Sequence, residues 1–275
     1  VFSQDLSAPS VVPAVNSWVS EHTNKMIPSI LSKPFNENAA LLLVNALYLK
    51  NTWETEFDPN NTYLRGFYHQ GSDKESMDFL NAGFVTFPYL QSETAQGAVL
   101  PYDDGRLAFF ALMPEEGAEF EVWLNSLDGD TFTGLLESRR DTEFRTLALP
   151  KFEAEWDGQL QDILSALGLD LAFTFGEADF SLLGDNPNGY FLSQVIHAAK
   201  IEVNEQGTEA AAATVVAAAS GAAPPQEGVT LIFDRPFLYG IVDLETGVLK
   251  PLYTFDQHTF VNALTVGDDG IIYFY

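Results

Sequence analysis

The sequence predicts an α+β fold, because strand-like and helix-like hydrophobic spacings both occur in it and follow no regular order. Strand-like alternation is clearest in 142–156 and 192–203, and helix-like spacing is clearest in 11–31. A wound α/β sheet would instead alternate one strand with one helix. The 275 residues suffice for one large domain or two small ones.

The first half of the chain opens with a helical pattern and continues with short strands. Apolar residues in 11–31 recur three and four positions apart, so we expect a helix that Pro28 ends or kinks. The segment 39–49 is apolar except for one asparagine, which suits a buried helix or a strand covered on both faces. The polar residues after it favour a strand. Alternation within 62–113, clearest in 108–113, predicts several more.

The second half repeats this mixture. Helical spacing occurs in 120–136 and again in 160–167, where Gly168 ends it. Alternating or apolar segments predict strands over 142–156, 192–203, 229–233 and 237–242.

The segment 207–226 departs from both patterns, with alanine at nine positions and one charged residue. Such a composition suits an alanine-rich helix or a low-complexity linker. Against a helix stand the β-branched run 214–216 and the pair Pro224-Pro225. The segment could therefore be helix, coil or strand according to its surroundings.

The composition argues against several classes of partner. Thirteen basic against 39 acidic residues leave a formal charge of −26, which repels phosphate and anionic lipid. We therefore expect neither nucleic-acid nor membrane binding, and no apolar run approaches the ~20 residues of a membrane span. The chain has no cysteine, so disulfides and thiolate metal ligands are excluded.

No constellation typical of an enzyme occurs in the sequence. The four histidines are His22, His69, His197 and His258, and none belongs to a HExxH zinc pattern. A GxSxG elbow and glycine-rich phosphate loops are also absent. We therefore expect no catalysis, no metal and no cofactor, and His197, among apolar neighbours, reads as a core histidine.

The segment 200–214 (KIEVNEQGTEAAAAT) closely resembles the hinge of inhibitory serpins, the suicide inhibitors of serine and cysteine proteases. Other motifs resemble the family in the expected order: NSWV at 16–19, LVNALYLKNTW at 43–53, LPY at 100–102, LPKF at 149–152, ADFS at 178–181 and DRPFL at 234–238. The resemblance implies a serpin fold over 1–255, with a large central β-sheet, flanking helices and an exposed reactive-centre loop.

In this family the loop inserts into the main sheet as an extra strand after cleavage, so its residues should be small. Between Thr208 and Val216 no side chain is bulky, and only Glu209 is charged. The hinge residues implied by the resemblance are Glu205, Gln206, Gly207, Thr208, Glu209, Ala210, Ala211, Ala212, Ala213 and Thr214.

The family's spacing places the scissile bond sixteen residues past Glu205, between Gly221 and Ala222. Nearby alternatives are Ala217, Ala218, Ala219, Ser220 and Ala223. All are small, so a shallow apolar pocket, elastase-like or subtilisin-like, would accept them. The implied partner is thus a target protease, held as a covalent acyl-enzyme by a monomeric inhibitor.

Two supporting pairs also carry over from the resemblance. Asn45 and His197 match a pair that hydrogen-bonds beneath the opening strands, and Lys151 and Glu205 match a charge pair at the top of the sheet with Trp53 packed nearby. Each has a plainer alternative. The first pair could only satisfy buried backbone, and the second could be an exposed ion pair worth about 0–1 kcal/mol.

The chain departs from the family pattern at both ends. The helices that would precede Val1 are missing, so we expect an N-terminally incomplete serpin, and secretion is favoured over the cytoplasm with any signal region out of view. The tail 256–275 does not match the family ending. Its segment 262–275 could be a hairpin around a Gly-Asp-Asp-Gly turn, or an unrelated tail.

Overall fold

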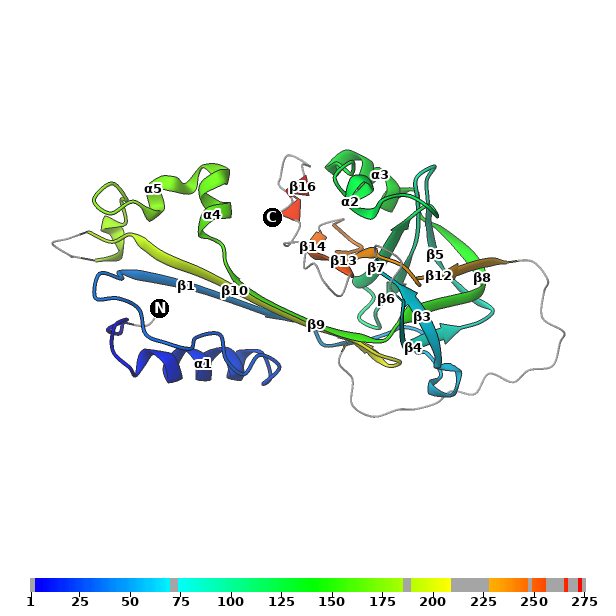
Figure 1. The fold of residues 1–275 in the computed structure, drawn as a ribbon, viewed down its shortest axis with the longest axis horizontal. Helices are drawn as coiled ribbons and strands as arrows, with labels where there is room; N and C mark the ends of the chain where they lie inside the picture. Colours follow the sequence, from blue (N-terminus) through cyan, green and yellow to red (C-terminus); the bar gives the residue numbers. More distant parts are fainter. Residues whose placement is uncertain are drawn as a thin grey trace. The chain divides into compact units, whose positions relative to one another are not determined.

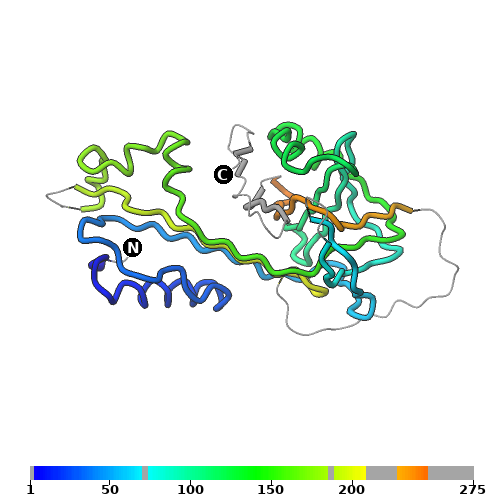
Figure 2. The backbone as a smooth tube through the Cα atoms, viewed as in Figure 1, coloured from blue at the N-terminus to red at the C-terminus, as the bar shows by residue number. Residues whose placement is uncertain are grey.

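A computed structural model of the chain describes residues 3–69, 74–184, 189–208, 228–246, 249–255, 265–266 and 272–273. The chain forms two compact units, Val1–Leu49 with Glu153–Ile201 and Lys50–Phe152 with Glu202–Tyr275. Each unit combines strands with helices, as an α+β fold predicts (Figures 1 and 2).

The first unit is built on long strands. β1 (Leu41–Tyr48) runs parallel to β10 (Leu192–Val203), which also pairs with β9 (Phe152–Gln159). The segment 39–49 therefore forms a strand, as its flanking residues favoured, but this strand is not covered on both faces, because Leu43 and Leu47 are 51% and 39% exposed. Helix α1 (Val11–His22) packs on one side of β1 and β10 (Figure 1). The apolar contact joins Val15, Trp18 and Val19 of the helix with Val44, Ala46 and Ala198 of the strands.

The predicted helix over 11–31 is too long, because α1 ends at His22. The Thr23 hydroxyl donates to the Val19 carbonyl at 2.8 Å and accepts from the Ile27 amide at 3.2 Å. Asn24 and Lys25 then adopt positive φ angles of 51° and 68°, which a right-handed helix does not allow. The chain has turned away before it reaches Pro28.

The helical layer after β9 is also more broken than predicted. α4 (Gln161–Leu164) ends before Gly168, a wider turn covers Ser165–Leu169, and α5 (Asp170–Phe173) follows. Gly168 has a φ of 94°, so it does redirect the chain, but one more helical turn forms beyond it. The short 3-10 turn Ser181–Leu183 completes this layer.

The second unit contains a nine-stranded sheet in the order β14-β13-β7-β6-β5-β8-β4-β3, with β12 beside β8. The pairs are antiparallel except for that of β12 with β8. The strands are β3 (Tyr63–Tyr68), β4 (Lys74–Ala82), β5 (Val85–Gln91), β6 (Ala95–Pro101), β7 (Leu107–Pro114), β8 (Arg140–Pro150), β12 (Val229–Ile232), β13 (Phe237–Asp243) and β14 (Leu249–Phe255).

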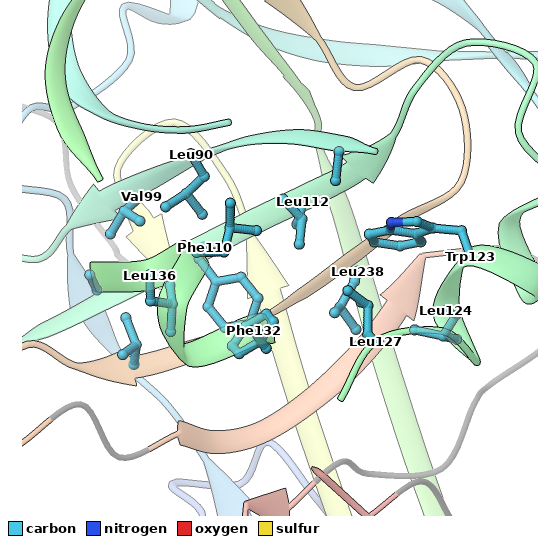
Figure 3. Close-up of a cluster of buried hydrophobic side chains, with 14 of the residues drawn as sticks. Leu90, Val99, Phe110, Leu112, Trp123, Leu124, Leu127, Phe132, Leu136 and Leu238 are labelled. Carbon is cyan, nitrogen blue, oxygen red and sulfur yellow. The ribbon is translucent and has the colours of Figure 1, made fainter. Parts of the chain in front are cut away.

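Two helices, rather than the single helix predicted over 120–136, cover part of this sheet. α2 (Phe120–Leu124) and α3 (Gly129–Glu137) are separate because the Asp128 side chain accepts from the Thr131 amide at 2.8 Å and starts a new helix. Beneath them lies a cluster of buried apolar side chains (Figure 3). It includes Leu90, Val99, Phe110, Leu112, Trp123, Leu127, Phe132 and Leu238.

The alternating segment 142–156 forms two strands, because β8 ends at Pro150 and β9 begins at Phe152. Lys151 stands between them, and its amide donates to the Asp78 carbonyl of β4 at 2.8 Å. This hydrogen bond fixes the position of the Lys151 backbone between the two strands.

Near the end of the chain β15 (Thr265–Val266) pairs antiparallel with β16 (Ile272–Tyr273), as the hairpin interpretation of 262–275 expects. The boundary of the tail at residue 256 stays a prediction. Over the described part of the chain, no helix combines the length and the apolar character needed to cross a bilayer.

Candidate functional site

The described part of the predicted hinge begins in a turn at Glu205 and continues as a short strand, β11 (Gly207–Thr208). Gly207 and Thr208 pair antiparallel with Thr52 and Asn51 of β2 (Asn51–Thr52), and Thr208 also pairs with Val203 of β10. β11 therefore lies between two other strands. Two hinge residues, Gly207 and Thr208, are therefore already part of a sheet.

A tight turn connects β10 to β11. The Asn204 amide donates to the Gly207 carbonyl at 3.0 Å, and the Asn204 side-chain oxygen accepts from the amides of Gln206 at 3.0 Å and Gly207 at 3.3 Å. An asparagine that bonds its own following backbone stabilises a turn. This arrangement reverses the chain over four residues.

Gly207 is required by close packing against β2. A Cβ at this position would lie 2.8 Å from the Thr52 Cα and closer still to the Asn51 carbonyl oxygen. Backbone atoms cannot give way as a side-chain end can, and the φ of 154° also favours glycine. The close approach of β11 to β2 therefore depends on this glycine.

Trp53 stabilises this turn through two hydrogen bonds. Its indole nitrogen donates to the Asn204 carbonyl at 2.9 Å, and its amide donates to the Gln206 carbonyl at 2.9 Å. The ring is 2% exposed and stacks on Tyr102 at 4.9 Å between centroids. The tryptophan thus contacts the turn that carries Glu205. The resemblance implied that Trp53 packs near the pair of Lys151 and Glu205.

Glu205 lies at the tip of this turn and has two side-chain partners. The Lys151 ammonium donates to it at 2.9 Å, and the Thr62 hydroxyl donates at 2.9 Å. Burial alone would raise the pKa of Glu205, but the hydrogen bonds from Lys151 and Thr62 outweigh it, so the pKa is lowered. The predicted group of Lys151, Glu205 and Trp53 is therefore brought together around one turn, and its role in loop movement stays a prediction.

A second buried contact involves the hinge residue Thr208. Its hydroxyl lies 2.6 Å from the Tyr102 hydroxyl, and both residues have an exposed fraction of 0%. Burial raises the pKa of Tyr102 far above its usual value, so the phenol stays protonated. Neither Tyr102 nor Thr62 has a role that the sequence alone predicts. Tyr102 ends the motif LPY at 100–102, but no sequence signal shows which hinge atoms these two side chains reach.

The other predicted pair, Asn45 and His197, also meets. These residues are directly opposite each other in the β1–β10 ladder, and the Asn45 side-chain nitrogen lies 3.0 Å from His197 Nδ1. Trp156 of β9 packs on the imidazole at 5.4 Å between ring centroids. Burial lowers the pKa of His197, so the folded protein favours the neutral ring.

The lowered pKa of His197 makes stability depend on pH. The unfolded chain, with a histidine pKa near 6.5, binds the proton first, so stability falls as the pH drops below about 6.5 and levels off below the folded pKa. We expect the urea midpoint of the wild-type protein to fall between pH 7.5 and 5.5 more steeply than that of His197→Gln. The exposed His22 supplies the control His22→Gln. An unchanged slope in His197→Gln would remove His197 as the cause.

Several predicted site residues lie outside the described residues. These are Glu209, Ala210, Ala211, Ala212, Ala213, Thr214, Ala217, Ala218, Ala219, Ser220, Gly221, Ala222 and Ala223. The reactive bond therefore stays a prediction. Where the structure describes side chains, no group of three or more histidine or acidic residues could hold a metal ion.

Comparison of the sequence with protein-family models identifies the family to which this fold belongs. The family model described as "Serpin (serine protease inhibitor)" matches residues 1–250. The chain belongs to the serpin family. The predicted α+β serpin fold is thus confirmed, and the turn at Asn204–Gly207 lies within the matched region.

Individual serpins are similar to this chain over most of its length. Serpin-Z1C of Triticum aestivum is 34% identical over 251 residues, which cover 88% of this chain and 62% of that protein. Intracellular coagulation inhibitor 2 of Tachypleus tridentatus is 32% identical over 237 residues, covering 86% of this chain and 57% of that protein.

A solved serpin agrees with the observed fold. The native structure of the thermophilic serpin tengpin superposes with a TM-score of 0.79 at 30% identity, covering 88% of this chain and 61% of that one. This chain therefore spans about three-fifths of the length of the serpins it matches.

Proposed function

We propose that this serpin is a suicide inhibitor of serine proteases, with cysteine proteases as a second target class. The protease attacks the loop as it would a substrate and forms an acyl-enzyme. The cleaved loop then inserts into the sheet and carries the attached protease with it. The distorted protease cannot hydrolyse the acyl bond, because its oxyanion hole and catalytic residues lose their alignment.

The observation that carries this proposal is the position of β11 between β2 and β10. A strand that starts there can lengthen only by separating strands that now pair, such as β1 and β10, whose ladder ends at Tyr48 and Lys200. The hinge residues that follow are Glu209, four alanines and a threonine, so the side chains are small except for one glutamate and suit entry into a sheet.

The energy of insertion is sufficient for this role. About ten new backbone hydrogen bonds at ~0.5–1.5 kcal/mol each would release on the order of 10 kcal/mol. The hydrogen bonds between β1 and β10 must first break, which opposes this gain. Each of the two strands then regains a partner, because the inserted strand pairs with both. The net gain in free energy therefore comes from the loop backbone, whose hydrogen bonds to water are replaced by hydrogen bonds to the neighbouring strands.

We further propose elastase-like or subtilisin-like targets. Every candidate residue before the scissile bond is alanine, serine or glycine. A deep acidic pocket selective for lysine or arginine gains no contact from such side chains, whereas a shallow apolar pocket is filled by them.

The test is a denaturing gel of the chain mixed with pancreatic elastase at several ratios. We expect a covalent band at the summed mass, which a catalytically inactive elastase does not produce. Cleavage near Gly221 without this band would indicate a substrate, and the same experiment with the N-terminal region of a full-length serpin restored would then decide between a non-inhibitory member and an incomplete one.

A further inference from the structure

We propose that Tyr102 is a positioning residue that anchors the hinge residue Thr208 in the sheet, through the hydrogen bond between the hydroxyl groups of these two residues. The proposal rests on the inhibitory function proposed above. It adds a residue that sets how readily the loop starts its insertion.

The geometry of Tyr102 suits an anchor because its own backbone is firmly held. Its amide donates to the Leu107 carbonyl at 3.0 Å, and it forms a β-bridge with Trp53. The ring is fully buried against the Trp53 indole, with an interplanar angle of 5°. The hydroxyl therefore has little freedom to follow Thr208 if that residue moves.

The contact also reaches across a strand. The segment around Tyr102 lies beside β2, because the Asp103 amide donates to the Thr52 carbonyl at 2.9 Å and the Glu54 amide to the Pro101 carbonyl at 2.9 Å. β11 pairs with the same two-residue strand β2. The Tyr102 side chain thus joins β11 to a segment that β11 does not itself pair with.

The short length of β11 makes this extra bond matter. A strand of two residues has few ladder bonds, so its opening should be frequent unless something else holds it. Two fully buried hydroxyl groups that bond each other leave a buried polar atom unpaired when they separate, which is costly. The bond therefore keeps Thr208 ordered at the point from which the loop would extend.

The first experiment measures hydrogen exchange of the 204–208 segment in the free chain, without protease. Tyr102→Phe removes only the hydroxyl, and we expect exchange to become about tenfold faster, the equivalent of one typical hydrogen bond. Tyr89→Phe is the matched control, because Tyr89 also donates its hydroxyl to a side chain of the same unit, Gln96 at 3.2 Å. It should leave this segment unchanged.

The second experiment is a double-mutant cycle with Thr208→Val, which keeps a β-branched side chain and removes the hydroxyl. If the two hydroxyls act through each other, Tyr102→Phe in that background should accelerate exchange by less than about twofold. Fully additive effects, or an unchanged exchange rate in both single variants, would overturn the anchor.

The two proposals fail in different ways. If the chain forms the covalent complex, Tyr102→Phe should raise the ratio of cleaved to trapped chain severalfold, and an unchanged ratio would overturn the role in insertion. If exchange responds as expected while neither the wild-type chain nor its form with the N-terminal region restored makes a complex, the anchor stands and the inhibitory function is overturned.

Discussion

Phe110→Ala is expected to lower the free energy of unfolding by about 3–5 kcal/mol, measured by urea denaturation followed by tryptophan fluorescence. Phe110 of β7 has an exposed fraction of 0% and lies under α3, where its ring meets that of Phe132 at 5.2 Å and 61°. Alanine would remove the ring contact and leave a cavity, which strands on both sides of β7 prevent from closing.

The matched control is Phe84→Ala in the same unit, where the ring is 46% exposed. Surface substitutions of this kind usually change stability by less than about 0.5 kcal/mol. Equal losses in the two variants would show that the cluster in Figure 3 does not hold this unit together.

Strands and their partners were predictable where the hydrophobic pattern and the resemblance agreed. The segments 39–49 and 192–203 form β1 and β10, and Asn45 meets His197 because these strands pair in parallel. A strand with one covered face is specified by the side chains on that face, so its pattern survives in the sequence.

Helix boundaries were less predictable, because single hydrogen bonds decide them. The apolar spacing continues past His22, yet Thr23 caps the chain and Asn24 turns it. Asp128 likewise divides 120–136 into two helices through one bond to the Thr131 amide. Periodicity averages over many residues and does not register such local events.

The contacts around the hinge could not be predicted from spacing at all. Tyr102 and Thr208 are 106 residues apart, and Thr62 and Glu205 are 143 apart. Tyrosine and threonine are common residues with no pairing signature, so only the folded sheet shows which of them meet. The resemblance identified Lys151 and Glu205 because that charge pair belongs to a family motif, and it left the hydroxyl contacts unassigned.

Gly207→Ala is expected to lower the free energy of unfolding by about 1–3 kcal/mol and to reduce covalent complex formation at least about tenfold. The added Cβ would approach the backbone of Asn51 and Thr52, so β11 must move away from β2. The loop would then lose the strand from which insertion is proposed to start. Urea denaturation and the elastase gel measure the two effects.

The control is a second glycine-to-alanine substitution, which is expected to raise the free energy of unfolding instead of lowering it. Gly134 lies in α3 with no atom within 4 Å of an added Cβ, so Gly134→Ala should stabilise the protein by about 0.5–1 kcal/mol and leave complex formation unchanged. The same methyl group is thus added twice, once in open space and once between two strands. If Gly207→Ala instead stabilised the protein as Gly134→Ala does, β11 would have room for a side chain beside β2. The proposal that insertion begins from a closely packed pair of strands would then be wrong.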